Sequence, residues 1–286
     1  MANLKEIRSR IASVGSTMKI TSAMKMVSAA KLKKAQDAIT HMRPYANKLT
    51  ELLQNLSATL DENAGSVYAQ QREVKKVLVV AITSNRGLCG AFNSNIVKET
   101  LQHIEDQYAG KEVKVLTIGK KGHEILRKRA DIYKHEIHIF DDLTFDKAAV
   151  IAQEVMDAFE DGGFDRVDLI YNRFKNAGTQ IPTTEQFLPI EPLTDGEAIV
   201  GDYIFEPSKK TIVEVLIPKS LKMQLFKALR DSFAAEHGAR MTAMHKATDN
   251  ASELKDELTL TYNKARQAAI TGEILEIVGG AEALKG

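Results

Sequence analysis

The chain has a single cysteine, Cys89, and no tryptophan among its 286 residues. One cysteine cannot form a disulfide within the chain, so the sequence favours a reducing compartment and excludes an internal thiol switch. Aromatic residues make up only 6% of the total, as expected of a chain rich in two-helix coiled coil. No apolar run approaches the roughly 18 residues needed to cross a bilayer. Prolines number only 6, which permits very long helices.

The near-zero net charge of +1 hides a strong asymmetry along the chain. Between Lys5 and Lys48 there are ten lysines and arginines, against only Glu6 and Asp37. Such a basic helix either has a solvated face or meets an acidic partner surface. Residues 1–13 are basic and contain serine like a transit peptide, but their apolar positions continue the pattern described next, so we expect them to be part of the folded protein.

Seam positions, most of them apolar, recur at both ends of the chain in alternating steps of four and three, the pattern of coiled-coil helices. At the start they are Ile7, Ile11, Val14, Met18, Thr21, Lys25, Ser28, Leu32, Ala35, Ile39, Met42, Ala46, Leu49, Leu53, Leu56 and Leu60. Near the end they are Ala247, Ala251, Leu254, Leu258, Thr261, Ala265 and Ala268. The simplest partner for each end is the other end. We therefore predict an antiparallel coiled coil of the N- and C-terminal helices with a globular unit inserted between them.

The middle of the chain alternates between strand and helix patterns, which is typical of a largely parallel sheet with helices on its faces. Strands are predicted at Val77–Ile82, Val113–Ile118, Tyr133–Phe140 and Arg166–Tyr171, with an edge strand containing Pro182 at Gln180–Phe187. Helices are predicted at Leu4–Leu60, Asn95–Tyr108, Lys121–Arg129, Phe145–Phe159 and Ser208–Val278. The first helix is expected to bend at Pro44, and Pro218 is expected near a break in the last.

These patterns give the fold class α/β, with an antiparallel coiled coil of both termini plus an inserted Rossmann-like domain. The predicted parts are an N-terminal helix over residues 1–62, a globular α/β domain over 74–207 and a C-terminal helix over 208–286. A loop-rich exit from the domain carries Pro189, Pro192, Asp195-Gly196 and Pro207. We expect the domain to fold on its own, and we expect Gly238 to be a tolerated weak point in the last helix.

The segment from Thr83 to Asn93 follows a strand and contains Gly87 and Gly90, so it is a candidate phosphate-binding turn. Neither of the phosphate-binding patterns G-x-G-x-x-G and G-x-x-x-x-G-K-[ST] occurs. A turn between a strand and a helix, with Asn93 or Ser94 as the helix cap, is the simpler explanation of these residues. His135 and His138 would lie on opposite faces of a strand, which argues against a metal pair. Cys89 is expected to be buried and inert. No catalytic constellation emerges, and no cofactor is predicted.

Thr21, Lys25 and Ser28 interrupt the apolar pattern of the first helix, where a stable coiled coil would prefer leucine or isoleucine. One interpretation is a polar layer that sets the register of the two helices. The other is that the stretch from Met18 to Ser28 faces something other than its partner helix.

Three separated segments resemble the gamma subunit of rotary ATP synthases. The most specific is the run from Ala265 to Ala283, with Ile270-Thr271, then Glu273 and Glu276, then Gly280-Ala281. The other two are Lys5–Ile11 with Thr17–Val27, and Thr83–Gly90, where Asn85 stands at a position often acidic in the family. The resemblance covers essentially the whole chain.

This resemblance implies a non-catalytic central rotor shaft that couples proton flow through a membrane ring to ATP synthesis or hydrolysis in an alpha/beta hexamer. It implies alpha, beta and epsilon subunits and the c-subunit ring as partners, no nucleic acid, no direct nucleotide binding, and a peripheral place on the cytoplasmic face of a bacterial membrane. Residues with implied partner contacts are Met24, Lys25, Arg240, Arg266, Gln267, Thr271, Glu273 and Glu276. A nucleotide-binding enzyme and a coiled-coil scaffold remain as the other classes, separable by nucleotide binding and by co-purification with ATPase activity.

Overall fold

The computed structural model describes residues 4–57, 67–190 and 209–284. Contacts divide the chain into two compact units, one made of Met1–Val27 with Met241–Gly286 and the other of Ser28–Arg240. Two long helices, α1 (Leu4–Ser57) and α5 (Lys209–Ala283), contribute residues to both units.

The larger unit is built on a five-stranded sheet in the order β3-β2-β1-β4-β5. The strands are β1 (Lys76–Ile82), β2 (Glu112–Ile118), β3 (Asp131–Glu136), β4 (Arg166–Asn176) and β5 (Thr179–Leu188). Neighbours are parallel except β4 and β5, which form an antiparallel hairpin. Val80 of the central strand lies opposite Leu116 on one side and Leu169 on the other. The predicted parallel sheet with an edge hairpin strand is therefore confirmed.

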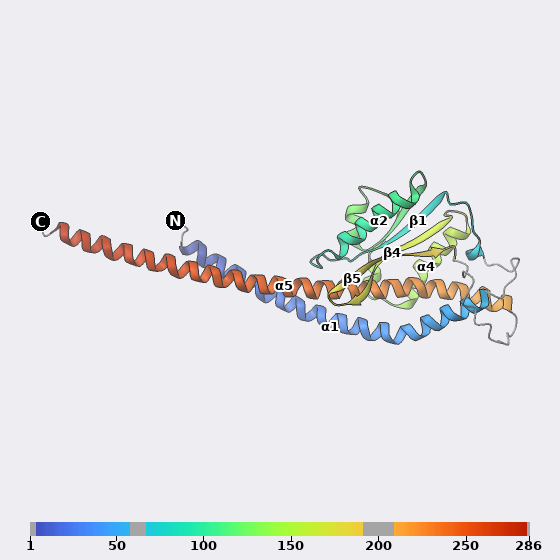
Figure 1. Ribbon diagram of the computed structural model, residues 1–286, viewed down its shortest axis with the longest axis horizontal. Helices are drawn as coiled ribbons and strands as arrows, with labels where there is room; N and C mark the ends of the chain where they lie inside the picture. Colours follow the sequence, from blue (N-terminus) through green and yellow to red (C-terminus); the bar gives the residue numbers. More distant parts are fainter. Residues whose placement is uncertain (1–3, 58–66, 191–208, 285–286) are drawn as a thin grey trace. The chain divides into compact units, whose positions relative to one another are not determined.

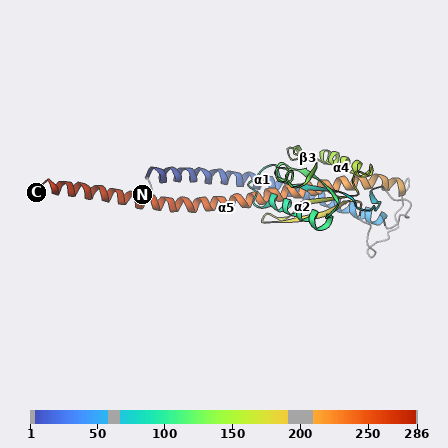
Figure 2. The same cartoon turned by 90° about the horizontal axis from the view of Figure 1, so that it is seen from above.

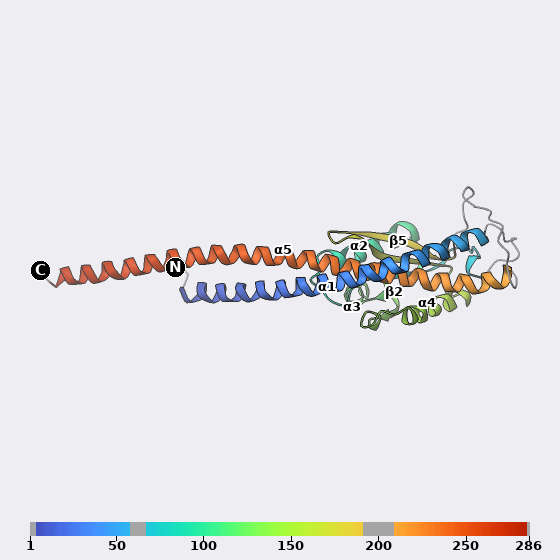
Figure 3. The ribbon, with the colours of Figure 1, turned by 90° about the horizontal axis from the view of Figure 1, so that it is seen from below.

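Helices cover both faces of this sheet. Between the strands run α2 (Phe92–Tyr108), α3 (Lys120–Leu126) and α4 (Phe145–Glu160), with short 3-10 turns η2 (Val67–Ala69) and η3 (His138–Phe140). Figure 1 shows α2 on one face and α4 with α5 on the other, and the views from above and below agree (Figures 2 and 3). Side chains alternate across the sheet accordingly: Val77, Val79 and Ala81 pack with α2 and α3, whereas Leu78, Val80 and Ile82 pack with α4 and α5.

Helix α5 is part of the α/β core. Ile217, Leu221, Leu225, Ala228 and Leu229 are at most 5% exposed and belong to the same buried cluster as β1, β4 and α4. Burying a leucine side chain contributes about 2 kcal/mol, so this helix face is a substantial share of the core. The expectation that residues 74–207 fold alone remains untested, and the composition of the core argues against it.

The smaller unit pairs the start of α1 with the part of α5 beyond Arg240 in antiparallel fashion (Figures 1 and 3). The N-terminal pattern is covered as predicted, with Ile7 and Thr21 buried and Ile11, Val14 and Met18 half-buried. The C-terminal pattern is wrong in part, because Leu254 and Thr261 are exposed. Lys255 and Tyr262 are half-buried in their place, one residue later, and continue the four-three rhythm from Ala251 through Leu258 to Ala265.

Several predicted element limits need correction. The third strand ends at Glu136, since residues 138–140 turn into η3. Pro218 does not break α5, and the burial of Ile217 and Leu221 beside it offsets the lost backbone hydrogen bond. Helix α1 likewise continues through Pro44, and its second half is curved (Figure 1).

Neither Asn93 nor Ser94 caps α2, which begins earlier, after Ala91. The Asn93 side-chain oxygen instead accepts a hydrogen bond from the Ser84 amide at 2.9 Å. Outside the described residues lie Leu60, Pro192, Asp195-Gly196, Pro207 and Ser208, together with the predicted limits at 62, 207 and 208.

Replacing Leu225 with alanine tests the contribution of α5 to the core. We expect the Leu225→Ala variant to lose about 2–5 kcal/mol of unfolding free energy, because Leu225 is 1% exposed and a cavity would remain. Val215 is on the same helix and 62% exposed, so Val215→Ala should change the unfolding free energy by less than about 0.5 kcal/mol. Urea denaturation of the full chain, followed by circular dichroism, measures both. Equal effects would contradict a core role for α5.

Candidate functional site

The segment after β1, from Thr83 to Ala91, lies at the carboxyl end of the central strand. Its side chains and carbonyls cap the start of α3: Lys120 N–H donates to the Asn85 side-chain oxygen at 3.0 Å, and Gly122 N–H donates to the Thr83 hydroxyl at 2.9 Å. The Lys121 amide donates to the carbonyl of Ser84 at 3.0 Å. Three acceptors of the candidate phosphate turn, the Thr83 hydroxyl, the Ser84 carbonyl and the Asn85 side-chain oxygen, are therefore used to start α3.

The tip of the same segment is held by Arg240 of α5. The Arg240 guanidinium donates to the carbonyl oxygens of Arg86 at 3.1 Å and Gly87 at 3.3 Å. The next residue, Leu88, has a φ of 62° and a side chain that is 66% exposed. A non-glycine residue in this left-handed region is strained, and it persists only where its surroundings fix it.

Arg240 also forms a buried ion pair with Glu236, one helical turn earlier, at 2.6 Å. Both side chains are about one-tenth exposed. Burial raises the pKa of the Glu236 carboxyl, although Arg240, Lys31 and Arg86 act to lower it. His237, between them in sequence, packs edge-on against Phe233. Burial, with the charges of Arg240 and Lys31, lowers the pKa of His237 to about 3, so its imidazole is neutral at physiological pH.

Cys89 completes this buried group, which confirms the prediction that its thiol is buried. It is 1% exposed and packs with Phe92, Ala235, Ala239 and Phe174. Burial raises the pKa of its thiol, so the reactive thiolate is disfavoured. His135 stacks on His123 with ring centres 3.7 Å apart, whereas His138 pairs with Asp141, so the two histidines do not form a site. No cluster of three or more metal-ligating side chains occurs among the described residues.

The predicted partner-contact residues fall into three groups. Met24 and Lys25 are half-buried on α1. Arg240 is 6% exposed and engaged within the chain, so any contact it makes with a partner remains a prediction. The rest are exposed on the last part of α5, namely Arg266, Gln267, Thr271, Glu273 and Glu276. Arg240 belongs to the larger unit, and the other two groups belong to the smaller one.

The last part of α5 carries exposed apolar residues between these polar ones. Ile270, Ile274, Leu275, Ile277 and Val278 are each between 48% and 71% exposed. The stretch lies beyond the N-terminal end of α1 (Figures 1 and 3), and from Arg266 to Leu284 every described residue except Gly272 is exposed. A helix with exposed apolar side chains of this number marks an interaction site.

The polar interruption of α1 has a structural explanation at Thr21. Thr21 is 8% exposed, and its hydroxyl lies 2.8 Å from that of Thr248 on α5. Each hydroxyl also lies within hydrogen-bond distance of a backbone carbonyl one turn earlier, Met18 and Met244 respectively. Because the two hydroxyls have two protons between them, one donates to its carbonyl while the other donates to the first hydroxyl or to its own carbonyl. This pair favours the interpretation of a polar layer that sets the register, because a buried hydroxyl discriminates against slipped pairings. The Thr21–Thr248 pair does not explain why Met24 and Lys25 occupy their positions.

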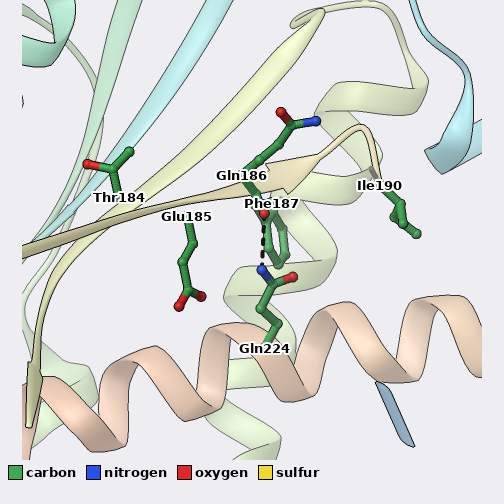
Figure 4. Close-up of a pocket in the computed structure, with 6 residues that line it drawn as sticks. All are labelled: Thr184, Glu185, Gln186, Phe187, Ile190 and Gln224. Atoms are coloured by element: carbon green, nitrogen blue, oxygen red, sulfur yellow. Dashed lines mark hydrogen bonds between the residues drawn. The ribbon is translucent and has the colours of Figure 1, made fainter. Parts of the chain in front are cut away.

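A shallow cavity of about 430 Å³ lies where α5 passes the edge strand β5 (Figure 4). The Gln224 amide donates to the carbonyl of Gln186 at 3.1 Å, and Glu185 accepts the hydroxyl of Tyr171 at 2.7 Å. Pro182 offers no N–H on the same strand. The proline and the contact with α5 therefore hinder this edge strand from pairing with a strand of another molecule, as is common at the edges of natural sheets. Thr184, Phe187 and Ile190 complete the lining.

Sequence reasoning missed Glu236, His237 and the inward role of Arg240. It also missed how closely α5 approaches the β4-β5 hairpin at Gly238, where an added Cβ would lie 3.2 Å from Ala177 Cα and 3.4 Å from the Phe174 ring. An alanine here would require the hairpin to shift by a few tenths of an ångström, so the expectation that Gly238 is a tolerated weak point stays a prediction. The run of small residues Ala234, Ala235, Gly238 and Ala239 was the available signal, since small side chains let backbones come together.

His237 gives a pH dependence of stability whose sign is fixed by its lowered pKa. The unfolded imidazole binds a proton below about pH 6.5 and the folded one only below about pH 3, so the unfolded state binds more protons in that window. Stability should therefore fall as the pH falls through it. We expect the wild-type chain to lose about 1–2 kcal/mol more than His237→Gln between pH 7 and pH 5, measured by urea denaturation. Glu236 titrates with the opposite sign but is common to both proteins, so an identical loss would contradict this assignment.

Comparison with known proteins places these features in a family. Residues 3–284 match a family model described as ATP synthase. The chain is 70% identical over 287 residues to the ATP synthase gamma chain of Flavobacterium psychrophilum and 55% identical over 297 residues to that of Cytophaga hutchinsonii, covering at least 99% of each chain.

Solved structures agree with these sequence matches. The central stalk and c-ring structure of the Tetrahymena thermophila mitochondrial ATP synthase contains a chain 28% identical, with a TM-score of 0.60 over 80% of this chain and 99% of that one. A chain of the Euglena gracilis enzyme has the same fold, with 22% identity and a TM-score of 0.71 over 98% of this chain and 94% of that one. This chain belongs to the ATP synthase gamma chain family, whose members are central-stalk subunits of the ATP synthase rotor.

Proposed function

We propose that this chain is the non-catalytic rotor shaft of a proton-translocating ATP synthase, coupling proton flow through a c-subunit ring to ATP synthesis or hydrolysis in a hexamer of alpha and beta subunits. The observation that carries the proposal is the last part of α5, whose apolar side chains, Ile270 to Val278, are exposed on a single helix. A helix of this kind buries its apolar side chains against another protein. A sleeve of alpha and beta subunits around it would supply that surface.

Rotation by such a helix would couple to catalysis through differential contact. Three chemically identical sites can differ in affinity only if an asymmetric partner touches each differently. Shifting one site from mostly open to mostly closed requires about 5.5 kcal/mol of preference. Several exchangeable contacts meet this requirement better than one tight bond. The exposed polar residues Arg266, Gln267, Thr271, Glu273 and Glu276 are suited to this role.

The basic first half of α1 supplies a second contact surface. Lys19, Lys31, Lys33 and Lys34 are exposed there, beside the exposed apolar side chains of Met26 and Val27. An acidic segment of a beta subunit passing this surface would meet both charge and apolar area. We propose that Met24 and Lys25 lie near such a moving beta-subunit segment. The α/β domain would face the epsilon subunit and the c-ring.

The chain itself would act without binding nucleotide. Support comes from the segment after β1, which has neither glycine-rich phosphate-binding pattern and whose tip is held against α5 by Arg240. No helix of the described residues is long and apolar enough to cross a bilayer. We therefore propose a peripheral place on the cytoplasmic face of a bacterial membrane, with attachment through partner subunits.

Co-expression with alpha and beta subunits tests this function. We expect the chain to co-elute with both in a complex that hydrolyses ATP, while the purified chain alone neither hydrolyses ATP nor binds it in equilibrium dialysis. A variant with Ile274→Asp and Ile277→Asp should assemble less well, because two carboxylates would be desolvated. The matched variant Glu273→Asp and Glu276→Asp changes exposed acids conservatively and should assemble normally. Normal assembly of both would remove the support from the apolar stretch.

Replacing Met24 with lysine tests the proposed α1 contact. The added charge beside Lys25 should form an extra ionic contact with a passing acidic segment. This contact should lower the free energy of one rotational position of the shaft, relative to the others, by about 1–3 kcal/mol. The complex should still hydrolyse ATP but move fewer protons for each ATP, with a higher activation barrier. Met24→Leu conserves volume and should behave as wild type. ATP-driven proton pumping in membrane vesicles, divided by ATP hydrolysed, gives the comparison. Equal ratios in all three proteins would place Met24 outside the contact.

A further inference from the structure

In the α/β unit, residues Ala235 to Arg240 of α5 are held from two sides. On one side they meet the segment after β1, through Cys89 and Phe92 in the buried cluster and through the carbonyls of Arg86 and Gly87. On the other side Gly238 approaches the β4-β5 hairpin. Asn172 of β4 joins the two sides, since its side-chain amide donates to the carbonyl of Phe92 at 3.0 Å. We call residues 235–240 with these two contact sides the α5 clamp.

The position of the clamp in the sheet is informative. Strand order reverses between β1 and β4, and in doubly wound folds ligands bind in the crevice outside the carboxyl ends of the strands at that point. Here the α5 clamp lies beside the segment that leaves the carboxyl end of β1. The place where related folds hold a ligand is therefore taken by a helix of the same chain.

Two residues make contacts that fit only one rotation of α5 about its own axis. Arg240 reaches two adjacent carbonyls and Glu236 at once, which uses the planar fork of the guanidinium and which a lysine cannot reproduce. Gly238 allows the hairpin backbone to approach, and any side chain there would crowd Ala177. Turning α5 about its axis would break the Arg240 contacts and drive a larger residue into the hairpin.

We infer that the α5 clamp is the joint that transmits torque between the α/β domain and the long α5 helix, with Arg240 and Gly238 as its positioning residues. The inference rests on the proposed rotor function. Torque delivered to the domain loads the contacts that hold α5 against rotation. The apolar side chains from Ile217 to Leu229 resist rotation through their packing, and the Arg240 hydrogen bonds add a directional restraint at the C-terminal end of this packed segment.

A disulfide can replace the clamp and separate this role of Arg240 from a contact with another subunit. Cys89, the only cysteine of the chain, packs with Ala239. Ala239→Cys places a second thiol at this contact. We expect Arg240→Lys to lower the protons pumped per ATP hydrolysed by about twofold or more. In the double variant Arg240→Lys with Ala239→Cys, oxidation should raise the number of protons pumped per ATP to the value of Ala239→Cys alone. Reduction should return it to the lowered value of Arg240→Lys.

The matched control is Arg240→Lys with Ala239→Ser, which cannot form the bond and should not respond to oxidation. Mass spectrometry of the chain establishes whether Cys89 has bonded to the thiol introduced by Ala239→Cys. Failure of the bond to form would refute the contact on which the clamp is built. A formed bond with no recovery of coupling would show that Arg240 acts at another subunit, and the inference would be wrong.

A measurement on the isolated chain keeps this test separate from the rotor function. Cys89 should react slowly with a thiol reagent in the wild-type chain, and about tenfold faster in Arg240→Lys if the guanidinium holds the segment closed. Unchanged labelling would refute the clamp whatever the complex does. Faster labelling together with a wild-type complex that pumps no protons would instead count against the proposed function.

Discussion

The contact between α5 and the sheet is the constraint on which the rest of the molecule depends. Six apolar residues of α5 from Ile217 to Leu229 lie in the main core, and Arg240 fixes the helix to the segment after β1. The same helix, which runs from Lys209 to Ala283, also supplies one of the two helices of the coiled coil and the exposed apolar stretch.

Burial of charge at this contact has a cost that apolar packing would avoid. A buried ion pair often adds little net stability relative to well-packed apolar residues, whereas removal of one partner is strongly destabilising. Arg240 and Glu236 therefore contribute more to a fixed geometry than to overall stability. The pKa of His237 is lowered first by burial, which disfavours the charged imidazole, and further by the positive charge of Arg240 beside it.

Local patterns in the sequence predicted much of this fold and little of the clamp. Strand β1 and the start of α1 were found because their apolar periodicity reflects burial directly. The seam of α5 slipped at Leu254, because alanines at several positions leave the choice between neighbouring faces to the partner helix. Pro218 was assigned near a break because a local rule cannot see the burial of Ile217 and Leu221.

The residues of the clamp are separated by about 150 positions, and no spacing rule connects Arg86 with Arg240. What the sequence does contain is an arginine, a glutamate and a histidine among small residues in a helix that must be buried. Charged groups at such positions are satisfied by partners within the fold or by another protein, and the sequence alone could not choose between them. The structure gives Arg240 two carbonyls and a carboxylate inside its own chain. A residue so engaged acts first on the position of α5, and its predicted contact with a partner subunit stays a prediction, as it does for Arg266 and Gln267, which are exposed on the last part of the helix.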